Sequence, residues 1–153
     1  MAWSIYGSYE VGVMSEIHAD AKHTPVAYDA AAGDKFVFTA RRPMTVVGFG
    51  LEVITAYAAM STAQKMSLDK RDTHNSDTGR VELAEVTAVN GWADGHHYIK
   101  EFNSVDLDVG QQLIIEQKVQ GATGGGGAGA CIPFILWFPR SEIPDLQSYL
   151  HLL

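Results

Sequence analysis

Hydrophobic and polar residues alternate with a period of two along much of the chain. The clearest case is residues 105–119, where apolar residues alternate with aspartates up to Val109 and with polar residues again from Leu113. This period is typical of strands that have one buried face and one solvent-exposed face. Because Gly110 lies between the two runs, the stretch predicts a β-hairpin whose second strand presents Gln112 and other polar residues to solvent.

The same alternation predicts further strands. In residues 44–55, Gly48 and Gly50 lie opposite the large apolar residues, which indicates a bulge or the close approach of another segment. The alternation in residues 81–89 slips near Glu85, as it does at a bulge. Residues 56–64 fit either a short helix or a loop. Besides the hairpin, strands are predicted at residues 9–13, 35–40, 44–55, 65–71, 81–89, 98–102 and 130–138, the last apolar on both faces and therefore buried on both.

About eight strands separated by turns, with at most one short helix, predict an all-β fold. The expected architecture is a jelly roll or another two-sheet antiparallel β-sandwich. An immunoglobulin-like sandwich is disfavoured, because the single cysteine rules out the Cys…Trp…Cys pattern. We expect one sandwich domain at residues 34–139, with an extended N-terminal arm at residues 1–33 and a C-terminal tail at residues 140–153.

Composition and charge narrow the class of protein. Of the 153 residues 46% are hydrophobic and 19% charged, which is typical of a globular chain. The net charge of −7 argues against nucleic-acid binding, because phosphate contacts need clustered Lys and Arg. The basic residues are scattered, and the adjacent pair Arg41 and Arg42 is interpreted as a solvated strand end. Neither a signal peptide nor an apolar run long enough to cross a membrane is evident.

No catalytic or cofactor-binding motif stands out. The glycine-rich stretch at residues 121–130 lacks the lysine of a phosphate-binding loop, so it predicts a flexible hairpin loop. His96 and His97 are adjacent and would point to opposite faces of a strand, whereas strand metal sites use His-x-His. Cys131 lies in an apolar run and is expected to be a buried packing residue. We therefore expect no enzyme activity, no metal and no cofactor.

The two ends of the chain are unusually apolar. Chain ends are usually frayed and polar unless they dock on something. The last residues also keep helical spacing, which indicates a short amphipathic helix. Either both ends fold back on their own core or they pack on neighbouring subunits. The candidate partner contacts are Trp3, Ile5, Tyr6, Tyr9, Tyr149, Leu150, Leu152 and Leu153.

Three stretches resemble the jelly-roll head decoration (cement) proteins of tailed bacteriophages. They are residues 105–113, the Gly/Ala/Thr loop, and residues 132–136 with the sequence Ile-Pro-Phe-Ile-Leu. The resemblance implies a non-enzymatic virion protein, made in the host cytoplasm and located on the capsid surface. It implies the major capsid protein as partner. Self-association, most simply as a homotrimer, is also expected from the apolar ends and the two-faced last strand.

Two other classes of function stay open at this stage. A carbohydrate- or receptor-binding module of a phage tail or fibre could use Trp92, Tyr98 and Trp137 as stacking platforms. A cupin-like metalloenzyme is disfavoured by the adjacent histidines. Capsid co-sedimentation, glycan binding and metal analysis would separate these three classes.

Overall fold

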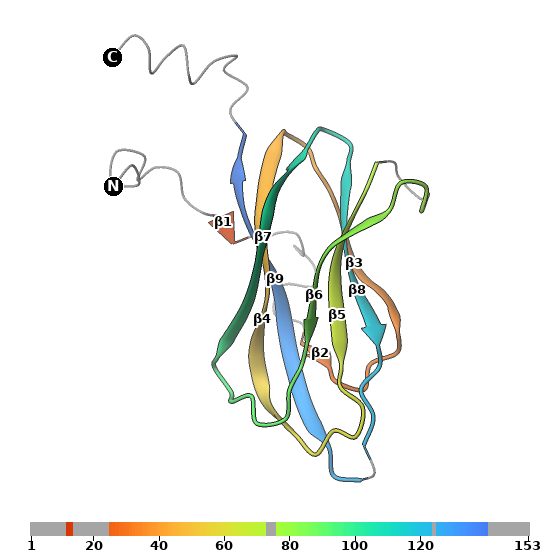
Figure 1. The fold of residues 1–153 in the computed structure, drawn as a ribbon, viewed down its shortest axis with the longest axis vertical. Helices are drawn as coiled ribbons and strands as arrows, with labels where there is room; N and C mark the ends of the chain where they lie inside the picture. Colours follow the sequence, from red (N-terminus) through yellow and green to blue (C-terminus); the bar gives the residue numbers. More distant parts are fainter. Residues whose placement is uncertain (1–11, 14–24, 73–75, 124, 141–153) are drawn as a thin grey trace, which may run out of the picture.

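The computed structural model describes residues 12–13, 25–72, 76–123 and 125–140, and within them every regular element is a strand (Figure 1). The strands form two antiparallel sheets packed face to face. Sheet A contains β1 (Gly12–Val13), β2 (Val26–Ala27), β4 (Met44–Ala58), β7 (His97–Leu107) and β9 (Ala128–Pro139). Sheet B contains β3 (Gly33–Thr39), β5 (Lys65–Arg71), β6 (Val81–Thr87) and β8 (Gln112–Val119).

The strand pairing is that of a jelly roll. From β2 onward, early strands pair with late ones in nested order: β2 with β9, β3 with β8, β4 with β7, and β5 with β6. Two further pairings, β4 with β9 and β5 with β8, complete the sheets in the orders β2-β9-β4-β7 and β3-β8-β5-β6. The expected all-β, two-sheet antiparallel sandwich is confirmed.

The predicted hairpin around Gly110 is wrong. Strand β7 pairs with β4 in sheet A, whereas β8 pairs with β3 and β5 in sheet B, so the turn crosses from one sheet to the other. Gly110 has a φ of 93°, which a glycine adopts without strain. Strand β7 ends at Leu107, and Val109 is exposed in the turn. The glycine-rich loop between β8 and β9 also joins the two sheets and is not a hairpin loop.

The wet face predicted for β8 is only partly correct. Lys118 is exposed, but Gln112 is only 1% exposed, and Ile114, on the outer face of sheet B, has no exposed surface. Alternation correctly placed Leu113 and Ile115 in the core between the sheets. Their outward-facing neighbours are buried because polar side chains from other segments lie across that face, as described below.

Strand β4 is the long central strand of sheet A, and its glycines allow close packing. Gly48 and Gly50 lie on the outer face, where side chains of β9 cover them: a Cβ built on Gly50 would lie 2.4 Å from Cζ of Phe134. The pairing of β4 also shifts register between Val46 and Gly48. The expected close approach and the expected bulge are therefore both present. Unbroken alternation in this strand would place Val47 in the core with Phe49 and Leu51. The register shift places Val46 there instead.

Two boundaries and the position of one bulge also differ from the expectation. Strand β4 continues to Ala58, so the structure has a strand and then a loop where residues 56–64 could have formed a helix. Residues 25–33, assigned to the N-terminal arm from the sequence, lie in the sandwich: β2 pairs with β9, and Val26 and Tyr28 belong to the core. The slip in β6 is a bulge at Leu83, two residues before Glu85.

Strand β9 is buried largely as expected. Its inner side places Cys131 and Ile135 in the core. Its outer side has Phe134 buried against Gly50, while Ile132 and Leu136 keep part of their surface exposed. The sandwich core therefore extends to the last described strand.

Candidate functional site

Both ends of the chain join the sandwich at one place. Gly12 of β1 pairs with Trp137 near the end of β9, and Arg140 follows three residues later (Figure 1). The connections 40–43, 72–80 and 108–111 lie at the same end of the sandwich. We call this the terminal end. The opposite end, formed by the connections 28–32, 59–64, 88–96 and 120–127, is called the far end.

Backbone hydrogen bonds hold the connections of the terminal end together. The Ala40 amide donates to the Gln111 carbonyl, and the Gly110 amide donates to the Ala40 carbonyl, both at 2.8 Å. The Arg140 amide donates to the Pro43 carbonyl at 3.1 Å, so the end of β9 is fastened to the connection between β3 and β4. The terminal end is therefore a defined surface, because these bonds fix its loops relative to one another.

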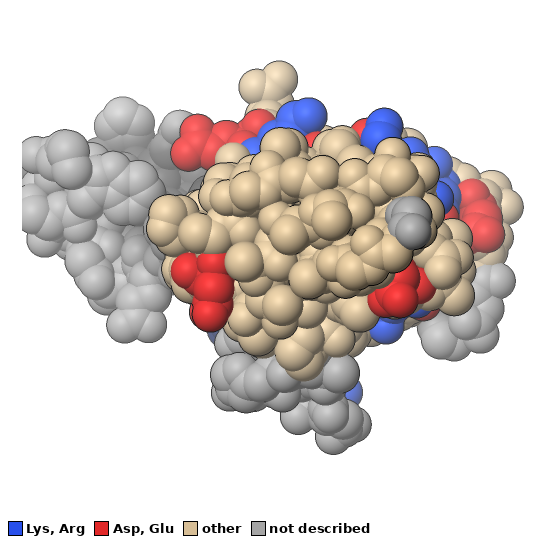
Figure 2. All heavy atoms as spheres, turned by 90° about the horizontal axis from the view of Figure 1, so that it is seen from below, with Lys and Arg blue, Asp and Glu red and all other residues tan. Residues whose placement is uncertain are grey.

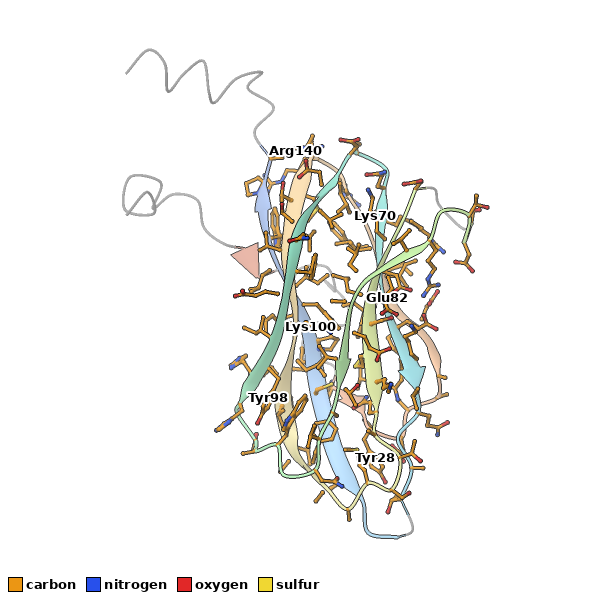
Figure 3. All side chains as sticks on the ribbon, viewed as in Figure 1. Tyr28, Lys70, Glu82, Tyr98, Lys100 and Arg140 are labelled. Carbon is orange, nitrogen blue, oxygen red and sulfur yellow. The ribbon has the colours of Figure 1, made fainter. Side chains whose placement is uncertain are left out.

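Arg140, which follows β9 at the terminal end (Figure 3), engages two of the carboxylates there. The Arg140 guanidinium lies 3.2 Å from Oδ2 of Asp106 and also contacts Asp108. The hydrogen bond that Arg140 donates to Asp108 raises the pKa of Arg140 above its ordinary value. Thr45 Oγ1 donates to Asp106 Oδ1 at 2.6 Å. The β7–β8 connection is thereby clamped to the end of β9.

Arg41 and Arg42 are different, because neither has a carboxylate within ion-pair distance in the described part of the chain. Both are exposed. The Arg42 guanidinium carbon lies 5.3 Å from the ring centroid of Trp137, a cation–π contact. Trp137 is only 7% exposed, and its indole Nε1 is buried without a hydrogen-bond partner. Such orphaned buried donors are rare in folded proteins.

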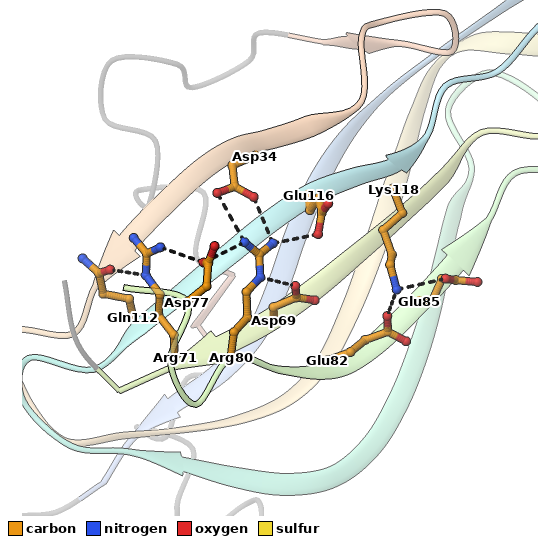
Figure 4. Close-up of polar contacts among 10 residues, drawn as sticks. All are labelled: Asp34, Asp69, Arg71, Asp77, Arg80, Glu82, Glu85, Gln112, Glu116 and Lys118. Carbon is orange, nitrogen blue, oxygen red and sulfur yellow. Dashed lines mark hydrogen bonds and ion pairs between the residues drawn. The ribbon is translucent and has the colours of Figure 1, made fainter. Parts of the chain in front are cut away.

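A second polar cluster lies on the outer face of sheet B (Figure 4). Arg80, just before β6, reaches across the sheet and contacts all three other strands. Its Nε donates to Asp69 of β5 at 2.7 Å, and Nη2 contacts Glu116 of β8 at 2.7 Å and Asp34 of β3 at 2.9 Å. Desolvation by itself lowers the pKa of Arg80. The hydrogen bonds that Arg80 donates to Asp34 and Asp69 raise the pKa by more than this, so the net shift is upward.

Neighbouring residues extend this ion-pair network. Arg71 Nε donates to Gln112 Oε1 at 2.7 Å, and Arg71 Nη1 shares Asp77 with Arg80. Lys118 pairs with Glu82 and Glu85 on the exposed side. Beneath the network, Ser67 Oγ and Asp69 Oδ1 are buried without partners. Most polar groups here satisfy one another, so the network accounts for the buried outer face of sheet B.

The far end is nearly free of charge. Seen end-on, its middle is an uncharged surface, with both acidic and basic groups toward the margins (Figure 2). Its four connections contain two aspartates, Asp29 and Asp94, and no Lys or Arg. Beneath it, Tyr57 donates to Gln64 at 2.6 Å and Gln64 donates to Gln117 at 2.9 Å. This buried polar chain fixes β4, β8 and the connection between β4 and β5 in place.

The three proposed stacking platforms do not form one surface. Trp92 and Tyr98 stack in parallel, with ring centroids 3.7 Å apart, and Tyr57 meets Trp92 edge-on at 5.9 Å. The rings of Trp92 are thus largely engaged by neighbouring aromatic residues. Trp137 pairs with Val46 at the other end of β4, and Tyr98 lies toward the far end (Figure 3).

Several candidate chemical groups occupy ordinary structural positions. His97 lies 3.9 Å from Glu52 and edge-on to Phe134, while His96 is exposed in the connection before β7. Among the described residues there is no group of three or more His, Cys, Asp or Glu placed to hold a metal ion. Burial raises the pKa of the Cys131 thiol to about 11, and Cys131 lies 3.6 Å from the sulfur of Met66.

The candidate partner contacts in the two terminal segments lie outside the described residues. The structure therefore locates only where those segments begin, at Gly12 and Arg140. Sequence reasoning noted Arg41 and Arg42 as a pair but took them as a solvated strand end. It missed Arg80 altogether, because the partners of Arg80 come from strands up to 46 residues away and leave no local signal.

Comparison of this chain with protein-family models and with curated proteins found no match. Within the described residues, no helix is long and apolar enough to cross a membrane.

Proposed function

We propose that this protein is a non-enzymatic structural component of a virion, a decoration (cement) protein. In this role it binds the outer surface of a tailed-phage head and stabilises contacts between major capsid proteins. The observation that carries the proposal is the shared exit of the two apolar terminal segments at the terminal end. The two segments that carry the eight large apolar candidate contacts are thus attached near each other, at Gly12 and Arg140, which suits a clamp on a neighbouring surface.

The fold is compatible with the proposal and does not establish it. Jelly rolls serve as capsid proteins, lectins and cupins, so function has to be argued from the site. The described residues offer a stable sandwich with satisfied ion pairs, a fastened set of loops and two attachment points. A scaffold of this kind suits a protein whose role is to hold other proteins together.

Energetics support docking through the terminal segments. Burying one large apolar side chain contributes roughly 1.5–3 kcal/mol, and ordering each residue costs about 1–2 kcal/mol. The N-terminal segment has four candidate contacts in its first nine residues, and the C-terminal segment has four in its last five. For each segment alone, the free energy gained by burying its apolar side chains is similar to the cost of ordering its residues. We therefore expect durable attachment to need several segments acting together, as in the proposed homotrimer.

Truncation tests the proposed function. Variants lacking residues 1–9 or 148–153 should remain folded and should co-sediment with capsids far more weakly than the full chain. As a matched control, a variant in which residues 148–153 are replaced by an equally long Gly/Ser segment separates loss of the apolar side chains from loss of chain length. It should bind as poorly as the deletion.

Two results would overturn the proposal. If the folded truncations bind capsids as tightly as the full chain, the terminal segments are not the contact. If the full chain does not bind capsids but binds a specific glycan on an array, the carbohydrate-binding alternative is favoured instead.

A further inference from the structure

We infer that Arg41, Arg42 and the indole N–H of Trp137 form a binding site for a carboxylate, and that its ligand is an acidic side chain of a partner protein. The identification of that partner with a capsid subunit rests on the proposed function; the site itself does not. Three observations lead to it: two free guanidinium groups, an orphaned buried donor beside one of them, and the shortage of free acceptors nearby.

The guanidinium groups are the first observation. The chain carries a net charge of −7, yet Arg41 and Arg42 are adjacent, exposed and without an ion pair in the region the structure describes. By contrast, Arg71, Arg80, Lys118 and Arg140 all have carboxylate partners. Two neighbouring uncompensated cations on an acidic protein attract an anion more strongly than any paired cation does.

The indole of Trp137 is the second observation. Its Nε1–H can only donate, it is buried, and no acceptor for it lies in the part of the chain that the structure describes. The Arg42 guanidinium lies over the same ring, 5.3 Å from its centroid. A carboxylate accepts several hydrogen bonds of about 2.8 Å from nitrogen donors, so one carboxylate beside this ring can serve both the indole N–H and the Arg42 guanidinium.

The surrounding acceptors are the third observation. Asp106 and Asp108 are held by Arg140, and Asp72 accepts a hydrogen bond from Gln111 at 2.8 Å. The carboxylates of the terminal end are therefore committed to other donors. A ligand for Arg41 and Arg42 has to come from outside the described residues. A carboxylate fits better than a nucleic-acid phosphate, because binding along a nucleic acid needs a larger cluster of Lys and Arg than this pair.

Binding at this site requires Arg42 to move. Trp137 is 7% exposed, and the exposed Arg42 side chain places its guanidinium over the ring. When the guanidinium turns toward an incoming carboxylate, the edge of the indole becomes accessible and Nε1–H gains an acceptor. The resonance of this N–H is thus a direct reporter of occupancy.

The test is a titration of the full-length, ¹⁵N-labelled protein followed by NMR. The chain has three tryptophans, so three indole N–H signals are expected, and Trp137→Phe assigns the one of interest. Adding a hexaglutamate peptide should shift that signal saturably, and a hexaglutamine peptide should not. In Arg42→Gln the affinity should fall by about tenfold or more, the effect of losing one charge-assisted hydrogen bond.

A matched control is Lys100→Gln, which removes an exposed cation that has no ion pair among the described residues and lies on β7 away from the terminal end (Figure 3). This variant should bind the peptide as the wild type does. An unchanged Trp137 signal, or equal losses in Arg42→Gln and Lys100→Gln, would overturn the site. Saturation by inorganic phosphate at lower concentration than by hexaglutamate would overturn the choice of a carboxylate.

Failure of the site and failure of the proposed function give different results. Peptide binding that depends on Arg42, with no capsid binding by the full chain, keeps the carboxylate site and removes the capsid as partner. In a second outcome, the double variant Arg41→Gln, Arg42→Gln no longer binds the peptide but still binds capsids as the wild type does. The carboxylate site then takes no part in capsid binding.

Discussion

At the scale of single residues, packing on the outer face of sheet A depends on the absence of a side chain at Gly50. The Phe134 ring lies directly over this glycine, where a Cβ would come within 2.4 Å of Cζ and 2.8 Å of two further ring carbons. An aromatic ring is rigid, so it cannot yield by bending. At Gly48 the nearest atom is Cδ1 of Leu136 at 3.1 Å, the end of a side chain that can rotate.

We predict that Gly50→Ala lowers the free energy of unfolding by about 1–3 kcal/mol, because overpacking forces Phe134 off its position. Urea denaturation measures the loss. Gly48→Ala is the control and should cost clearly less. Combining Gly50→Ala with Phe134→Leu should recover part of the loss. Equal costs at the two glycines would contradict this explanation.

Cys131 provides a pH-dependent prediction at the same scale. Burial raises the thiol pKa from 9.0 to about 11, so the folded state keeps the proton where the unfolded state has lost it. The contribution of the Cys131 thiol to the free energy of unfolding is fully present below pH 9, and it is lost as the pH rises to about 11. The loss amounts to roughly 2–3 kcal/mol, since each pKa unit corresponds to about 1.4 kcal/mol.

Chemical denaturation of wild type and Cys131→Ala between pH 8 and pH 11 checks this sign. The variant has no thiol, so its stability should fall less steeply with pH than that of the wild type. Parallel curves would show that Cys131 does not titrate differently in the two states.

At the scale of elements, Arg80 holds sheet B together from outside. One guanidinium contacts a carboxylate on each of β3, β5 and β8, while the residue itself precedes β6. All four strands of the sheet are thereby linked on a face that would otherwise expose Ile114. The side chain of Asp69 is only 7% exposed, so it depends on Arg80 for neutralisation.

We predict that Arg80→Ala destabilises the protein by about 3 kcal/mol, because it leaves the buried Asp69 carboxylate without a counter-charge. Lys118→Ala is the matched control, since it breaks an ion pair that is exposed on both sides and should cost less than about 1 kcal/mol. Thermal or urea unfolding measures both. If Arg80→Ala lowers the free energy of unfolding no more than Lys118→Ala does, Arg80 does not hold the strands of this sheet together.

At the scale of the whole molecule, the two ends of the sandwich have different characters. The terminal end carries charge, two attachment points, and Arg41 and Arg42, which have no ion pair within the described ranges, whereas the far end is nearly uncharged. The edge of sheet A is closed by β2 as well as by β1, and β2 lies well inside the chain. We therefore expect the described core to form without the outermost residues.

The truncations used to test function accordingly have an expected melting behaviour. Removing residues 1–9 or 148–153 should change Tm by less than about 3 °C, the shift that ~1 kcal/mol produces in a chain of this size. Differential scanning calorimetry measures the change. Cooperative unfolding lost on truncation would mean that these segments belong to the core.

The sequence by itself determined where most strands lie and which residues face the core. Alternation in β4 and β8 identifies Leu51, Val53, Leu113 and Ile115 as inward-facing, and all four belong to the buried core. Alternation in β3 likewise identifies Phe36 and Phe38, which are partly buried and pack against that core. The glycines of β4 also signalled close approach. These features are local, because the pleat of a strand sends successive side chains to opposite faces whatever the strand pairs with.

Only the tertiary structure decided which strands pair and what covers the outer faces. The turn at Gly110 is compatible with a hairpin or with a crossing between sheets, and long-range pairing of β7 with β4 selects the crossing. Ser67 and Gln112 look solvent-exposed from alternation, yet both are buried. Gln112 is buried where it accepts a hydrogen bond from Arg71, whose side chain comes from β5 (Figure 4). Arg80 and the unpaired Arg42 have no local signature for the same reason: a charge is paired or free according to what the fold brings within about 4 Å of it.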